Sequence, residues 1–193
     1  YDLAPYSANA RQHTVPRGCD RCDNLRAARS PAGCLPALSR GCCHGAMKLL
    51  PPKARPGDRV AILSPSLAAP GFAPAVHEQA MTRLAALTGL VPVEYPTTRQ
   101  LGASPEERAR DLNAAFADPS IRAILATVGG DDQIAVIPHL DGAAALSDPK
   151  PFLGFSDNTN LHQWLWSLGI ASFYGGSTQV HVGPGPHVDS IHL

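Results

Sequence analysis

The chain of 193 residues lacks several features that would place it in a broad class of protein. It has no apolar run near the roughly 18 to 20 residues that span a bilayer. It does not begin with a basic stretch followed by an apolar one, as a secretion signal does. Its formal net charge is zero, so the overall charge attracts it neither to nucleic acid nor to a membrane. We therefore predict a cytoplasmic protein with no nucleic-acid and no membrane partner.

Cysteine is absent after Cys43, and the five cysteines of the chain all precede that point. The first 46 residues also contain six arginines, no lysine and no helical or strand periodicity, whereas Met47 begins a segment like an ordinary protein start. We predict that residues 1–46 are a disordered or non-native extension. Zinc is an alternative reason for the cysteines, but the adjacent pair Cys42–Cys43 is poorly suited to chelating one ion. We predict no metal and no cofactor.

From residue 57 onward, strand-like and helix-like segments alternate. The clearest helix start is at Ser104, where Pro105 suits the first helical position and Glu107 completes a capping box. The alternation predicts an α/β fold with a doubly wound, mostly parallel sheet covered on both faces. The expected strands are 59–63, 90–93 (at an edge, because of Pro92), 121–128, 152–155 and 170–174, and the expected helices are 76–87, 105–116, 134–140 and 161–168.

Three loops with unusual chemistry follow expected strands. They are Ser64-Pro65-Ser66, Gly129-Gly130-Asp131-Asp132 and Ser156-Asp157-Asn158. Ligand sites in such sheets lie at the carboxyl ends of the strands, so we expect these loops to meet along one edge.

Ser156 stands directly between a strand and a helix. That position exposes its hydroxyl at a helix N-terminus, where free N–H groups favour developing negative charge. The strand–serine–helix elbow of hydrolases uses the same geometry, although Asn158 occupies the position of the second glycine in Gly-x-Ser-x-Gly. Ser156 is thus a candidate nucleophile, with plain helix capping as the alternative.

Two glycines, Gly129 and Gly130, let the backbone approach a ligand closely and aim an N–H group at a developing oxyanion. The alternative is a turn that requires positive φ. No strand is followed by Gly-x-Gly-x-x-Gly, and Gly-x-x-x-x-Gly-Lys is also absent. A nucleotide-binding α/β module therefore stays only as an alternative function. Asp131 and Asp132 are candidates for binding amino or peptide groups of a substrate, or for helix capping.

Three features together resemble the LD-carboxypeptidase family of serine peptidases, which includes a branch similar to microcin C immunity proteins. They are Gly-Asp-Arg-Val-Ala-Ile-Leu-Ser-Pro-Ser at 57–66, the Gly129-Gly130 loop, and Gly-Phe-Ser-Asp-Asn-Thr at 154–159. The resemblance covers about residues 47–185. It implies a flavodoxin-like N-terminal domain with Ser156 as nucleophile. It also implies oxyanion donors at the backbone of Gly130, with Gly129 as the alternative, and of Asp157. Gly129 and Asp131 are the candidates for substrate contact.

The family triad is Ser-His-Glu, and its histidine and glutamate belong to a C-terminal domain that no residue here matches. We therefore expect a nucleophile domain at 47–175, a truncated linker at 176–193 that adds no further element, and a chain that is inactive alone. The parent enzyme is expected to hydrolyse an L-to-D amide in cell-wall peptides, in peptidoglycan recycling, or a peptidyl-nucleotide. The expected partner is a small peptide or muropeptide, and the full-length parent is a candidate homodimer.

The histidines of this chain offer one stand-in base, His162, in the helix after Ser156. A place at the surface or an interface is the favoured alternative for it. His77 and His139 are expected to face solvent. The tail is expected to give no fixed position to the remaining candidates, His181, His187 and His192.

Overall fold

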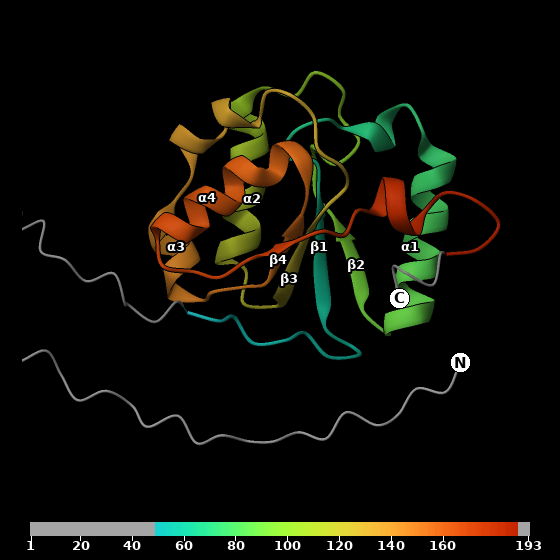
Figure 1. Cartoon of the computed structure of the whole chain (residues 1–193), viewed down its shortest axis with the longest axis horizontal. Helices are drawn as coiled ribbons and strands as arrows, with labels where there is room; N and C mark the ends of the chain where they lie inside the picture. The colour runs from blue at the N-terminus through green and yellow to red at the C-terminus, as the bar shows by residue number, and fades with distance from the viewer. Residues whose placement is uncertain (1–48, 189–193) are drawn as a thin grey trace, which may run out of the picture. The chain divides into compact units, whose positions relative to one another are not determined.

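A computed structural model describes residues 49–188 of the chain, which form a parallel sheet with helices against both faces (Figure 1). The predictions for residues 1–46 and their cysteines lie outside this range, as does His192. Within the described range, no helix is long and apolar enough to cross a membrane.

The five strands of the sheet all run parallel, in the order β2-β1-β3-β4-β5. This order confirms the doubly wound α/β fold and places the Pro92 strand at an edge. The last strand is shorter than expected, because Ile170 pairs instead with Leu49 in an isolated bridge. The strands are β1 (Arg59–Leu63), β2 (Val91–Glu94), β3 (Ile121–Ala126), β4 (Phe152–Gly154) and β5 (Phe173–Tyr174).

Four α-helices connect these strands, and the predicted capping box opens the second of them. The Ser104 Oγ accepts the Glu107 N–H at 3.2 Å, and the Glu107 carboxylate accepts the Ser104 N–H at 2.8 Å. The expected helix at 134–140 is wrong: Pro138 lacks an N–H donor, and two short 3-10 turns stand there instead. The helices are α1 (Pro74–Thr88), α2 (Pro105–Ala117), α3 (Gly142–Ser147) and α4 (Thr159–Ser167).

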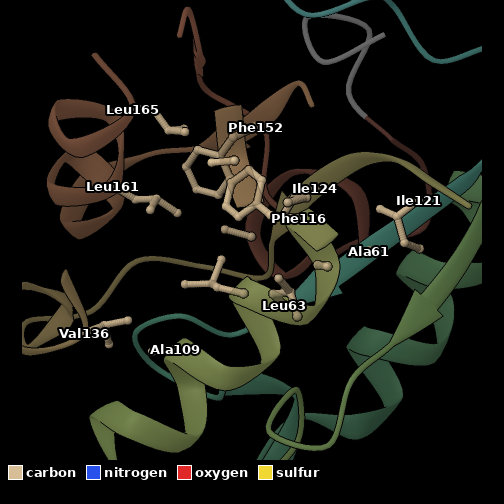
Figure 2. Close-up of a cluster of buried hydrophobic side chains, with 14 of the residues drawn as sticks. Ala61, Leu63, Ala109, Phe116, Ile121, Ile124, Val136, Phe152, Leu161 and Leu165 are labelled. Carbon is tan, nitrogen blue, oxygen red and sulfur yellow. The ribbon is translucent and has the colours of Figure 1, made fainter. Parts of the chain in front are cut away.

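The main hydrophobic core lies between the sheet and helices α2, α3 and α4 (Figures 1 and 2). Phe116 and Phe152 are its largest apolar side chains, and both are fully buried. The ring of Phe116 lies 6.0 Å from that of Trp164, centroid to centroid. This packing fixes the strands and therefore the positions of the loops at their ends.

Helix α1 covers the other face of the sheet over a smaller cluster formed with Val60, Ile62, Leu84 and Leu125. Farther along this face, toward β4 and β5, an apolar groove of about 630 Å³ stays open. Leu90, Leu153 and Phe173 are among the side chains that line it.

One further element follows β5, which corrects the expectation that none exists. Residues Thr178–Val182 form a π-helical turn that packs against α1. Ser177 donates its hydroxyl to the Thr127 carbonyl, and the Gln179 N–H reaches the same carbonyl at 3.1 Å. The Arg83 guanidinium on α1 donates to the carbonyls that follow the turn. The domain boundaries at 46 and 175 stay predictions.

Candidate active site

Three segments meet at the carboxyl ends of β1, β3 and β4, as the sequence predicts. We call them the β1 loop (64–67), the glycine loop (129–133) and the Ser156 turn (156–160). The Leu67 N–H donates to the Gly129 carbonyl at 3.2 Å, which joins the first two. The Ser66 hydroxyl donates to the Asp157 carboxylate at 2.6 Å, which joins the first and third. The site therefore lies where strand order reverses around β1 and β3, as ligand sites do in such folds.

Ser156 is the only non-glycine residue with positive φ among residues 49–188, at 60°. A left-handed backbone costs a side-chain-bearing residue roughly 1 to 2 kcal/mol, so the surrounding structure must hold it there. Its N–H donates to the Tyr174 hydroxyl at 3.1 Å, and the Thr159 hydroxyl donates to its carbonyl at 2.6 Å. The side chain is exposed at the start of α4. This is the elbow geometry that presents a serine hydroxyl to a substrate.

The two glycines of the glycine loop provide space, not an unusual φ, because neither has positive φ. A Cβ atom at Gly129 would lie 2.8 Å from the Ser156 Cβ and 3.1 Å from the Asp157 nitrogen. A Cβ atom at Gly130 would lie 2.0 Å from the Ser66 Oγ. The alternative of a turn that needs positive φ is therefore wrong. Gly129 contacts the Ser156 turn, and Gly130 contacts the β1 loop.

The side chain of Asp157 is turned into the protein framework. Its Oδ2 accepts the Ser66 hydroxyl and, at 2.9 Å, the Gln133 N–H, while its Oδ1 accepts the Asn160 amide at 2.9 Å. Its own N–H and that of Gly130 donate no hydrogen bond to any of residues 49–188. Two backbone donors beside an exposed serine are the groups that an oxyanion requires. Their predicted role as its donors remains a prediction.

The two aspartates of the glycine loop differ in their partners. Asp132 accepts both Nη atoms of Arg108 at 2.8 Å, and this hydrogen bonding lowers the pKa of the Asp132 carboxyl. It makes no side-chain cap, so the capping alternative is wrong for Asp132. Asp131 is exposed and has no polar side-chain partner within residues 49–188. Both line a cavity of about 150 Å³ with Ser66 and Arg108, and a substrate contact at Asp131 remains a prediction.

Comparison with known proteins identifies the family. Residues 60–175 match the family described as LD-carboxypeptidase N-terminal domain. The chain belongs to the LD-carboxypeptidase family. Its members are carboxypeptidase-like serine peptidases, so the resemblance of the three motifs is confirmed.

Relatives of this LD-carboxypeptidase domain are longer than the chain. A protein of Vibrio cholerae named as a carboxypeptidase is 34% identical over 135 residues, which are 67% of this chain and 40% of that protein. The microcin C7 self-immunity protein MccF of Escherichia coli is 34% identical over 87 residues, which are 45% of this chain and 25% of that protein.

Solved structures agree with the family fold. MccF in complex with aspartyl sulfamoyl adenosine superposes with a TM-score of 0.69 at 28% identity, over 75% of this chain and 44% of that one. An MccF-like protein from Streptococcus pneumoniae in complex with AMP superposes with a TM-score of 0.64 at 33% identity, over 69% of this chain and 42% of that one. The chain therefore spans less than half the length of these relatives.

His162, the stand-in base considered above, makes no hydrogen bond to the Ser156 hydroxyl. His162 is nearly buried, so its expected place at the surface is wrong. Its Nε2 lies 2.9 Å from the Gly154 carbonyl, which can only accept, so Nε2 carries the proton. Its Nδ1 then accepts the Ser172 hydroxyl at 2.8 Å. Both ring nitrogens are engaged, which leaves His162 no role as the base for Ser156.

Two other expectations for histidines are wrong. His77 is fully buried, because α1 packs it toward Glu94 on β2, and burial lowers the pKa of its imidazole. His181 is held in the π-helical turn with its ring 5.2 Å from that of Phe155. His139 and His187 are exposed, as expected for His139.

Sequence reasoning missed Arg108 and Gln133 as residues that shape this LD-carboxypeptidase site, and it placed Ser66 in one of the three loops without giving it a role. Gln133 is fully buried, donates to the Asn158 side chain at 2.7 Å and accepts the Leu161 N–H at 3.1 Å. A signal existed for Arg108: it stands four residues before Leu112, on the buried stripe of α2. A charge on such a stripe requires a partner. No local signal marks Gln133 or indicates the partner of Ser66, because these partners lie far along the chain.

Proposed function

We propose that Ser156 is the nucleophile of a peptidase that hydrolyses an amide through an acyl-enzyme. The observation that carries this proposal is the backbone of Ser156. Ser156 is held at φ 60° between a strand and a helix, and its side chain is exposed. It packs against Gly129, which has no room for a Cβ atom. This conformation is costly for a serine. Such strain concentrates at functional sites, and plain helix capping does not require it.

In the proposed reaction, the Ser156 oxygen attacks the carbonyl carbon of the scissile amide, and its proton passes to a general base. The N–H groups of Gly130 and Asp157 stabilise the resulting oxyanion. The C–N bond then breaks, and the base returns the proton to the departing amine. Water attacks the ester that remains, again losing a proton to the base, and restores the serine with release of the new carboxylic acid.

The general base is proposed to be a histidine oriented by a glutamate, as in the family triad, and to lie outside residues 49–188. The support is that both ring nitrogens of His162 are engaged with Gly154 and Ser172, while relatives of the chain extend well beyond the matched part. Without that base, a serine hydroxyl is a weak nucleophile at neutral pH. We therefore propose that residues 49–188, by themselves, are inactive or nearly so.

Two substrate classes fit the family. A Bacillus subtilis relative, 29% identical over 93 residues, is named as a probable murein peptide carboxypeptidase. This favours a cell-wall peptide cleaved at an L-to-D amide, in peptidoglycan recycling within the cytoplasm. The MccF structure that superposes on the chain holds an aspartyl sulfamoyl adenosine, which favours an aminoacyl or peptidyl nucleotide. Both are amides adjacent to an anionic or nucleotide group, so the same acyl transfer serves either.

Acylation can be measured by intact mass after mixing the chain with each substrate class, with imidazole added as an external base. The two probes are a tetrapeptide ending in a D-residue and aspartyl sulfamoyl adenosine. We expect one of them to leave an acyl group on Ser156. Ser156→Ala should abolish the adduct, whereas Ser147→Ala, at another exposed serine, should keep it. An absence of adduct with both probes would refute the proposed activity.

A further inference from the structure

A single buried guanidinium joins two of the three loops of the site. Arg108 of α2 is only 4% exposed. Its Nη1 donates to the carbonyls of Pro65 at 3.3 Å and Ser66 at 3.2 Å. Both Nη atoms also bind the two oxygens of Asp132, in the fork geometry that only arginine provides. The β1 loop and the glycine loop are therefore held against each other by one side chain.

The Ser66 side chain continues this connection to the nucleophile. Its hydroxyl donates to the carboxylate of Asp157, which also accepts the Gln133 N–H from the glycine loop. Gly130 lies so close to Ser66 that a Cβ atom there would reach 2.0 Å from the Ser66 Oγ. The Asp157 carboxylate thus receives one hydrogen bond from each of the other two loops.

These contacts do not extend to the substrate side of Ser156. The positive charge of Arg108 is opposed by Asp132, and its Nη atoms already have protein acceptors. Ser66 is 6% exposed, and its hydroxyl donates its hydrogen bond to the Asp157 carboxylate. The Ser66 hydroxyl can donate to a substrate only if its bond to Asp157 breaks, and the Arg108 charge is already balanced by Asp132.

We infer that Ser66 and Arg108 are positioning residues, which fix the N–H groups of Gly130 and Asp157 beside the Ser156 hydroxyl. This inference rests on the proposed function. Preorganised donors stabilise an oxyanion strongly because they need not reorient, and small displacements of them are costly. Loss of either side chain should release the loops from one another and move both donors, while the fold, which depends on the core, persists.

The test compares Ser66→Ala and Arg108→Lys with controls matched in residue type. Ser177→Ala removes another buried serine hydroxyl outside the three loops, one that donates to the Thr127 carbonyl. Arg122→Lys alters an arginine–aspartate pair formed with Asp148 at 2.9 Å, away from the three loops. The first readout is the rate at which a fluorophosphonate labels Ser156 of the 193-residue chain in imidazole. The second is the pair of amide NMR signals of Gly130 and Asp157.

Ser66→Ala and Arg108→Lys should each slow labelling about tenfold or more and shift both amide signals. The two controls should label within about twofold of the wild-type rate and leave the signals in place, whatever they do to the melting temperature. Wild-type labelling with unshifted signals in the two test variants would overturn the inference. Slowing that follows the melting temperature across all four variants would also overturn it, because it would indicate a purely stabilising role.

Failure of the proposed function has a different signature. In that case Ser156 of the wild-type chain is not labelled at all, and only the amide signals test the positioning role of Ser66 and Arg108. Shifts of Gly130 and Asp157 in the two test variants, absent from the controls, then support the positioning role. Unchanged signals overturn it.

Discussion

The edge of the sheet that carries Ser156 and the core beneath α2, α3 and α4 are built by different forces. At the edge, polar side chains from distant parts of the chain tie three loops together, and glycines are packed without room for a Cβ atom. In the core, fully buried apolar side chains fill the space between sheet and helices (Figure 2). Burial dominates stability, whereas a typical hydrogen bond contributes about 1 kcal/mol. Reactivity and stability should therefore respond to separate substitutions.

The largest expected effect is at Ser156. Ser156→Gly should abolish fluorophosphonate labelling, because the hydroxyl is lost. It should also raise the free energy of unfolding by up to about 2 kcal/mol, because glycine adopts positive φ without strain. Ser156→Ala is the matched variant: it also loses labelling but keeps the strained backbone, so it should bring no such gain. Chemical denaturation measures the free energy of unfolding of both variants. A Ser156→Gly protein less stable than Ser156→Ala would contradict the strain at this residue.

The next largest effect concerns the core. Phe116→Ala should lower the free energy of unfolding by about 3 to 5 kcal/mol, since the side chain is fully buried. The labelling rate of Ser156 in the folded protein should change little. Phe173→Ala provides the control, because that ring is 44% exposed and its loss should be much less costly. If Phe116→Ala instead slowed labelling as strongly as a change in the glycine loop, the two regions would not be separable.

A pair of glycines separates close packing in the glycine loop from backbone strain elsewhere. Gly130→Ala places a methyl group against Ser66 and should slow labelling about tenfold to a hundredfold. Gly102→Ala has open space around the new methyl group but a φ of 72°, so it should destabilise the fold by roughly 1 to 2 kcal/mol. Its labelling rate should stay at the wild-type value. Equal labelling rates for the two variants would contradict a role of the close packing at Gly130 in the reactivity of Ser156.

The smallest effect is a pH dependence from Asp132. The Arg108 hydrogen bonds lower the pKa of the folded Asp132 carboxyl from its ordinary value of 3.8. The folded state therefore binds this proton less readily than the unfolded state. The contribution to stability is present above about pH 4 and is lost as pH falls through the lowered pKa. Asp132→Asn should make the melting temperature fall less steeply as the pH is lowered. Asp131→Asn should leave that slope unchanged, because the Asp131 side chain has no polar partner within residues 49–188. Identical slopes for both variants would contradict the pairing.

The parts of this structure that sequence predicted best are those fixed by local patterns. The capping box at Ser104 and Glu107 formed as expected, because both partners lie within one helical turn. The apolar run of β3 became a buried strand flanked by strands on both sides. The parallel sheet and the meeting of the three loops at its edge followed from alternating strands and helices.

The parts that sequence missed depend on partners far along the chain. His77 is buried because β2 brings Glu94 beside it, and Lys150 is buried with contacts to Asp148 and the Phe116 carbonyl. Local composition favours an exposed position for both. Likewise, nothing near Ser66 in the sequence indicates Asp157, which is 91 residues away. The tail after β5 has glycines and prolines typical of a linker, yet α1 provides arginine and glutamine donors that hold it.

The role of Ser156 as nucleophile is tested most directly by site-mapped labelling of the 193-residue chain with a fluorophosphonate, with and without imidazole. Ser156 should be the labelled residue, and imidazole should accelerate the reaction, because it replaces the base that residues 49–188 do not place at the hydroxyl. Peptide mapping by mass spectrometry locates the adduct. Labelling spread over other serines, or none at Ser156 with imidazole present, would contradict the assignment of Ser156 as the nucleophile.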